Sequence, residues 1–146
     1  MNSFFMRSLL VAAIALAATS ALKANAGPLL DSEAQKIQHV VAAQFEAFAD
    51  DDADGAFQTA TPAVREAIGS SGLFLALVRG AYPMVYRPES VTFHKPEADQ
   101  GSVLQLVVIT DQNDKSWLAL FALEQQPDAS WRISGCVVTE NKWKPV

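Results

Sequence analysis

The chain has 146 residues, of which 50% are hydrophobic and 18% are charged, and its formal net charge at pH 7 is −5. This acidic balance argues against nucleic acid and anionic membrane surfaces as partners, because both attract basic patches. The single cysteine, Cys136, excludes an internal disulfide.

The N-terminal 26 residues have the three parts of a secretory signal peptide. Arg7 supplies the positive charge, and an uninterrupted apolar run of 14 residues covers Leu9–Leu22. Ala24-Asn25-Ala26 then matches the small-x-small cleavage pattern. We expect cleavage near Ala26-Gly27 and a periplasmic or secreted product. The alternative is an uncleaved membrane anchor, but a spanning helix needs about 20 apolar residues, so no stable membrane insertion is expected after cleavage.

Residues 27–146 have the size of one ordinary domain, large enough for a core without disulfides. Removal of Arg7 and Lys23 with the leader changes the formal net charge from −5 to −7. We interpret this charge as a solubility feature, which does not identify a partner.

The start of this domain has the spacing of an amphipathic helix. Ser32-Glu33-Ala34-Gln35 has the pattern of a capping box, in which the serine and glutamine side chains satisfy free backbone N–H groups. Apolar residues then recur at helical intervals from Ile37 to Phe48. We expect one helix that begins at the box and ends near Asp50.

Shorter helices follow the acidic segment Asp50–Gly55, which breaks the first helix. Thr61 can cap a helix that has Pro62 at its first position, where the missing N–H does no harm. The expected helices cover Ala56–Ala60, Ala63–Ile68 and a stretch from Ser70 to Gly80. In the last of these, the residues expected to face the core are Leu73, Phe74, Leu77 and Val78.

The second half changes to strand patterns after an extended connector, Tyr82–Pro88, that is bracketed by prolines. Short turns between the strands require antiparallel pairing. We therefore predict an α+β fold with N-terminal helices packed on a curved, four-stranded antiparallel sheet that encloses a hollow. The expected strands are Ser90–Lys95, Val103–Thr110, Ser116–Glu124 and Trp131–Glu140. Within the last strand, Cys136 is expected to be a small buried hydrophobe.

Several local strings resemble a bacterial family known as domain of unknown function 4864. They are Phe45-x-x-Phe48-x-x-Asp51-Asp52-x-x-x-Ala56-Phe57, Ala60-Thr61-Pro62, Tyr82-Pro83-Met84-Val85-Tyr86-Arg87-Pro88 and Trp131-Arg132-Ile133-Ser134-Gly135-Cys136. The family resembles the nuclear transport factor 2-like (cystatin-like) superfamily. This resemblance implies a cone-shaped α+β fold that often dimerises through the outer sheet face, but it transfers no catalytic residue.

Two patterns could carry metal or acid–base chemistry. Asp50-x-Asp52-x-Asp54-Gly55 matches the first half of a calcium loop, but the twelfth position is Thr61 instead of glutamate. The plain alternative is a turn with capping aspartates. His94 with Asp111 would be an acid–base pair only within hydrogen-bond reach, which their spacing does not establish. We assign no catalytic residue, no metal and no cofactor.

Aromatic and polar residues around the expected hollow are the best candidates for a ligand site. Mostly apolar walls with a few polar tips are typical of small-molecule pockets. We expect Trp117 and Trp131 to face one another across a hairpin. The predicted ligand-binding residues are Tyr82, Tyr86, Arg87, His94, Gln105, Trp117 and Trp131.

These patterns favour a non-enzymatic periplasmic module that binds a small apolar or amphipathic ligand or docks to a protein, with a homodimer as one form of docking. The alternative is an isomerase-like or cyclase-like enzyme with its site in the cone. Such an enzyme needs a buried base, and the expected strands offer Gln105 but no buried acid. A filled interior beside an exposed apolar sheet face would favour the interaction role.

Overall fold

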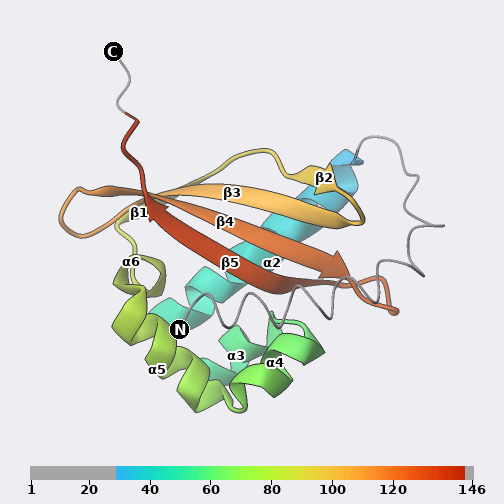
Figure 1. The fold of residues 1–146 in the computed structure, drawn as a ribbon, viewed down its shortest axis with the longest axis horizontal. Helices are drawn as coiled ribbons and strands as arrows, with labels where there is room; N and C mark the ends of the chain where they lie inside the picture. Colours follow the sequence, from blue (N-terminus) through green and yellow to red (C-terminus); the bar gives the residue numbers. More distant parts are fainter. Residues whose placement is uncertain (1–28, 144–146) are drawn as a thin grey trace.

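The computed structural model describes residues 29–143, which form an α+β fold with helices on one side of an antiparallel sheet (Figure 1). The predicted signal peptide and its cleavage site lie outside the described residues. Within 29–143, no helix is long and apolar enough to cross a bilayer. The helices are α2 (Asp31–Ala49), α3 (Ala53–Gln58), α4 (Pro62–Ile68), α5 (Ser71–Ala81) and α6 (Pro83–Tyr86).

Helix α2 begins without the predicted capping box. Leu30 is its N-cap residue, has an extended backbone and makes no side-chain capping bond. Ser32 therefore lies inside the first turn, and the prediction of its capping role was wrong. The acidic residues Asp31 and Glu33 lie in that turn, where negative charge interacts favourably with the helix dipole. The predicted end near Asp50 is confirmed, since Asp50 is the C-cap.

The caps of α3 and α4 follow local sequence chemistry. The Asp52 side chain accepts a 3.0 Å hydrogen bond from the Gly55 N–H, and α3 therefore begins earlier than predicted. Thr61 accepts from Val64 at 3.2 Å, which confirms its capping role. Gly69 ends α4 with a φ of 103°, a conformation that favours glycine.

Helix α6 replaces part of the predicted extended connector. Pro83 occupies its first turn, where the fixed φ and missing N–H suit a helix start. Met84 and Val85 are buried by this single turn. The extended prediction for Tyr82–Pro88 was wrong because the same proline that disfavours a helix before it favours one after it.

The sheet confirms the predicted antiparallel order and adds one short strand. Its order is β1-β3-β4-β5, and β2 pairs with the same edge of β3 as β1. Pro96 lies between β1 and β2, and proline cannot donate to a strand ladder. The strands are β1 (Ser90–Phe93), β2 (Glu97–Asp99), β3 (Ser102–Thr110), β4 (Ser116–Gln125) and β5 (Trp131–Glu140).

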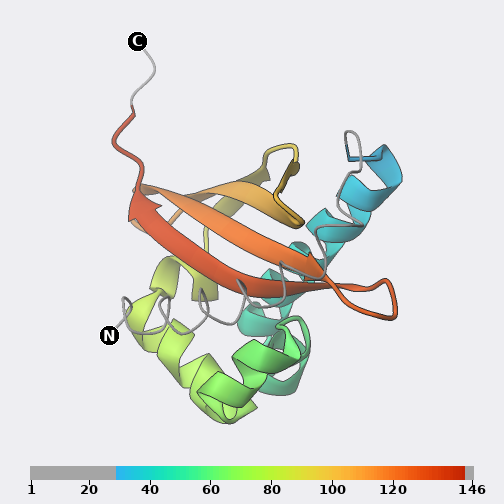
Figure 2. The same ribbon diagram turned by 45° about the vertical axis from the view of Figure 1, so that its right-hand side comes forward.

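The core lies between the sheet and α2, which crosses behind the strands (Figures 1 and 2). Phe48 on α2 and Phe121 on β4 are both fully buried, and the Phe45 ring meets that of Phe121 at a centroid distance of 5.8 Å. Side chains therefore fill the space in which the sequence predicted a hollow. The other fully buried large apolar residues are Ile37, Val41, Val107, Ile109 and Leu123.

Two core assignments were wrong. Leu73 and Leu77 of α5 are 48% and 45% exposed, because α5 packs mainly on α3 and α6 and leaves one apolar side outside. Cys136 is also exposed, in the part of β5 after Ile133, where no residue is buried.

Truncation of Phe48 tests the position of this core. We expect Phe48→Ala to lower the free energy of unfolding by about 3–5 kcal/mol, because Phe48 is fully buried and its loss leaves a cavity beside Phe74 of α5. Leu73→Ala is the matched control on the exposed side of α5, with an expected change within about 0.5 kcal/mol. Urea unfolding followed by circular dichroism measures both, and equal losses would contradict the described packing.

Candidate functional site

The seven predicted ligand-binding residues fall into separate places. Tyr86 and Arg87 lie at the end of α6 and bind the turn between α2 and α3. The Tyr86 hydroxyl donates to Asp51 Oδ1, and the Arg87 guanidinium lies 3.0 Å from Asp51 Oδ2 and 4.7 Å from the centre of the Tyr86 ring. Asp51 has a φ of 54°, which aspartate tolerates better than most residues. This cluster joins α6 to the α2–α3 turn, and Tyr82 lies at the other end of α6.

Gln105 and His94 meet at the interruption between β1 and β2. The fully buried Gln105 side chain donates from Nε2 to the backbone oxygens of His94 at 2.6 Å and Leu106 at 2.8 Å. It thereby holds the edge where the strand ladder is broken. Gln105 Oε1 is buried without a hydrogen-bond partner. The His94 residue is exposed.

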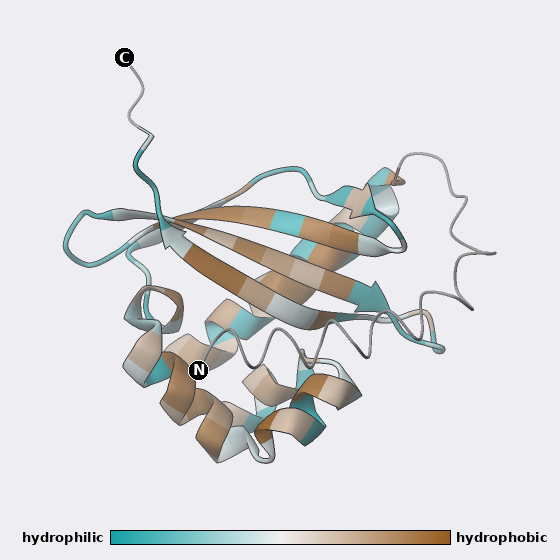
Figure 3. Cartoon of the chain, in the orientation of Figure 1, coloured by the Kyte–Doolittle hydropathy of each residue, from teal (hydrophilic) through white to brown (hydrophobic). Residues whose placement is uncertain are grey.

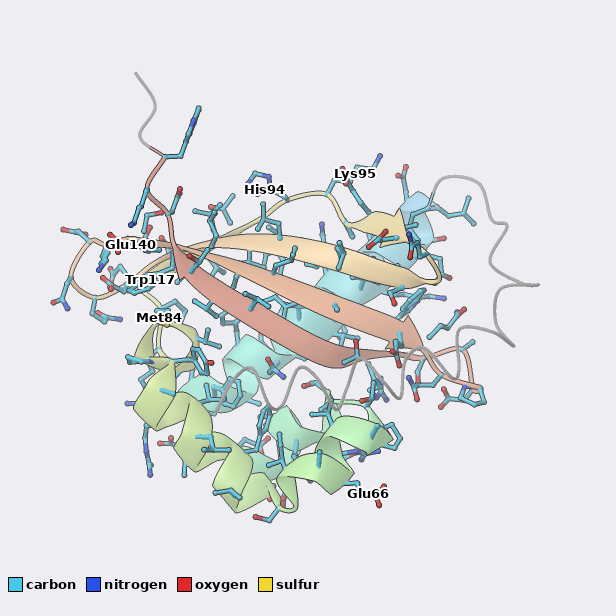
Figure 4. All side chains as sticks on the ribbon, in the orientation of Figure 1. Glu66, Met84, His94, Lys95, Trp117 and Glu140 are labelled. Atoms are coloured by element: carbon cyan, nitrogen blue, oxygen red, sulfur yellow. The ribbon has the colours of Figure 1, made fainter. Side chains whose placement is uncertain are left out.

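The two predicted tryptophans lie at opposite ends of the β4–β5 hairpin. Trp117 pairs with Glu140, whereas Trp131 pairs with Gln125, so the prediction that they face one another was wrong. Figure 4 shows Trp117 and its strand partner Glu140 at one end of the sheet. The sequence places both rings on one pair of strands but does not fix the register of that pair.

Each tryptophan donates its indole N–H to a carboxylate. Trp117 Nε1 lies 2.9 Å from Asp111 Oδ2, and Trp131 Nε1 lies 2.6 Å from Glu33 Oε2. The hydrogen bond from Trp131 is the main cause that lowers the pKa of Glu33, with a smaller contribution from Lys36. The bond from Trp117 likewise lowers the pKa of Asp111. Both bonds tie segments of the fold together.

The predicted acid–base pair is not assembled. His94 follows β1 beside Leu106, whereas Asp111 follows the far end of β3 and accepts from Trp117 and the turn backbone. His94 and Asp111 therefore lie at different places along β3.

The acidic segment Asp50–Gly55, which matches half of a calcium-loop pattern, has other partners. Asp52 caps α3, Asp54 accepts from the Ser71 hydroxyl, and Asp51 binds Tyr86 and Arg87. Over residues 29–143, no group of three or more histidine, cysteine or acidic side chains is placed to hold a metal ion.

The most extensive feature left is the outer face of the sheet. Successive residues of a strand point to opposite faces, so the partners of the buried residues of β3 and β4 point away from the helices. Three neighbouring strands place apolar residues there, and charged residues lie at the ends of the face, with Glu97 opposite Leu104 and Glu124 opposite Arg132. We define the outer sheet face as Leu104, Leu106, Val108, Leu118, Leu120, Ala122 and Val137.

The described helices do not cover this face. They pack on the other side of the sheet, through the contacts of α2, α4 and α6 with β3 and β5 (Figures 1 and 3). Leu120 is 38% and Val137 is 46% exposed. The apolar run of Val103–Thr110 indicated a strand buried on both faces. The sequence alone did not show that the helices cover only one of them.

A comparison of the sequence with known protein families gives a match over most of the chain. A family model described as "Domain of unknown function (DUF4864)" matches residues 30–146. The chain belongs to this family. The match spans the whole described fold of this DUF4864 protein and confirms the family resemblance found in its sequence. A search of curated proteins gave no match to the chain.

The Glu33–Trp131 bond gives a pH test of how α2 is held on β5. Because the bond lowers the folded-state pKa of Glu33, its contribution is fully present above the ordinary value of 4.5 and is lost as the pH falls through the lowered pKa. Trp131→Phe should therefore cost about 1 kcal/mol more at pH 7 than at pH 3.

Urea unfolding at the two pH values measures this difference. Trp143→Phe is the control, since Trp143 is 78% exposed. A cost of Trp131→Phe that does not change with pH would contradict the assigned role of Glu33.

Proposed function

We propose that this DUF4864 protein is an exported, non-enzymatic interaction module whose outer sheet face binds a second copy of the chain. The observation that carries the proposal is the outer sheet face itself, with seven apolar side chains on three adjacent strands. Burial of apolar surface contributes about 25 cal/mol per Å², so a contiguous face of this kind gains stability when it is covered.

The chemistry of the face favours a second copy as its partner. The chain carries 16 acidic residues against 11 basic ones, yet none of either kind lies among the seven positions. A sheet face with an apolar centre and charge only at its ends, at Glu97, Glu124 and Arg132, matches another of the same kind, and two sheets pack face to face about 10 Å apart. A two-fold axis through the face would make the interface self-complementary. The resemblance to the nuclear transport factor 2-like superfamily supports the same pairing.

The interior supports the interaction role over the enzyme alternative. The buried polar side chains among the described residues are Gln44, Thr59, Thr61 and Gln105, which are neither acids nor bases at neutral pH. An isomerase or cyclase needs a base that its substrate can reach. The packed core also leaves little room for a ligand beneath the sheet.

A charge placed in the outer sheet face should separate the two copies. We expect Leu120→Glu to convert a dimer to a monomer, because the carboxylate would lose water at the centre of the interface. Leu77→Glu is the matched control, since Leu77 on α5 is similarly exposed but lies outside the face. Analytical ultracentrifugation of the purified proteins reads the mass of each.

The outcomes distinguish dimerisation through the outer sheet face from non-specific association. A wild-type dimer that persists in Leu77→Glu and is lost in Leu120→Glu supports the proposal. A wild-type protein that stays monomeric at about 100 μM would contradict it, as would a dimer broken only by Leu77→Glu. Circular dichroism confirms that each variant is folded.

Export has its own test. We propose cleavage between Ala26 and Gly27, on the strength of the leader pattern. Intact mass spectrometry of the protein from the host's periplasm or medium should give the mass of residues 27–146. Ala26→Phe, which places a bulky residue at the cleavage site, should leave the leader attached. A full-length mass for the wild-type protein would contradict the proposed processing.

A further inference from the structure

Two adjoining hollows lie at the end of the sheet where the turn between β4 and β5 approaches α2 and α4. The larger has a volume of about 610 Å³ and the smaller of about 300 Å³. Ser130 and Arg132 line both, so the two hollows are neighbours on either side of these residues. Their combined size is in the range of small-molecule sites.

The larger hollow has both apolar and polar walls. It lies between one side of α2 and the start of β5; its apolar side chains are Val40, Ala129 and Trp131, and its other lining residues are polar or charged. The Trp131 ring is fixed by its bond to Glu33, which keeps this wall rigid. Lys36 and His39 stand at the edge, and Lys36 is also paired with Glu33 at 3.3 Å.

The smaller hollow carries two guanidinium groups, of which that of Arg132 interacts electrostatically with the Asp128 carboxylate. Arg65 of α4 and Arg132 of β5 both line it, and both are partly buried. Within residues 29–143, neither side chain forms an ion pair; Arg132 donates only to the backbone oxygen of Trp131. By contrast, Arg87 is paired with Asp51.

One carboxylate, that of Asp128, also lines the smaller hollow. It accepts hydrogen bonds from the Ser130 N–H at 2.9 Å and the Ser130 hydroxyl at 2.5 Å, and so stabilises the turn in which it lies. Asp128 offsets part of the positive charge, but two guanidinium groups remain against it. Arginine is the side chain best suited to hold a carboxylate or phosphate through paired hydrogen bonds.

We propose that the joined hollows bind an amphipathic anion, with its apolar chain against Trp131 and Val40 and its carboxylate or phosphate head between Arg65 and Arg132. Neither part of the site would bind such a ligand tightly alone, because the larger hollow is open to water and both arginine side chains are partly exposed to solvent. This site is separate from the seven residues of the outer sheet face, because none of them lines either hollow.

Isothermal titration calorimetry with the protein as its host produces it tests the site. The probes are decanoate, decanol with a similar chain but no charge, and inorganic phosphate with charge but no chain. We expect decanoate to bind in a 1:1 complex at least ten times more tightly than either of the other two. Arg65→Gln and Arg132→Gln should each weaken decanoate binding about tenfold.

The controls separate this site from other surfaces. Arg79→Gln, on α5 outside both hollows, should leave decanoate binding unchanged, and so should Leu120→Glu on the outer sheet face. Absence of decanoate binding would overturn the proposal, as would equal binding of decanoate and decanol or of decanoate and phosphate. Binding that is unchanged in both Arg65→Gln and Arg132→Gln would also overturn it. None of these results bears on whether the chain dimerises.

Discussion

The side chains of β3 and β4 point alternately to the two faces of the sheet, and the rest of this structure depends on that alternation. Both strands are apolar at odd and at even positions, so they present two apolar faces. Helix α2 covers one of them through Ile37, Val41 and Phe48. The described helices leave the other face open, and the proposed function follows from that imbalance.

Polar contacts at the periphery hold the helices on the covered face. The bond between Trp131 and Glu33 ties the start of α2 to β5. The contacts of Asp51 with Tyr86 and Arg87 tie the end of α2 to α6. Residues that the sequence suggested for ligand binding therefore position the helices, while the apolar stripe of α2 supplies the burial that stabilises them.

Features set by neighbouring residues could be predicted from the sequence. The cap at Thr61, the stop at Gly69 and both ends of β5 depend on local chemistry, and the structure confirms them. The helix at Pro83–Tyr86 could not be predicted, because Pro83 suits an extended connector and a helix start alike and the burial of Met84 and Val85 is not a local feature. The strand at Glu97–Asp99 could not be predicted because its pairing with the edge of β3 forms it. The candidate site depends on strand register and on which face of the sheet the helices cover, and a local sequence pattern determines neither.

The most direct test of the open-face account is solvent access to individual methyl groups as the protein concentration is raised. Leucine and valine methyl NMR with a soluble paramagnetic probe reports this access residue by residue. The account predicts that Leu106, Leu120 and Val137 lose access as copies associate, while Leu73 and Leu77 on α5 keep it. Outer-face methyl groups that stay equally accessible from about 10 μM to 1 mM would contradict it.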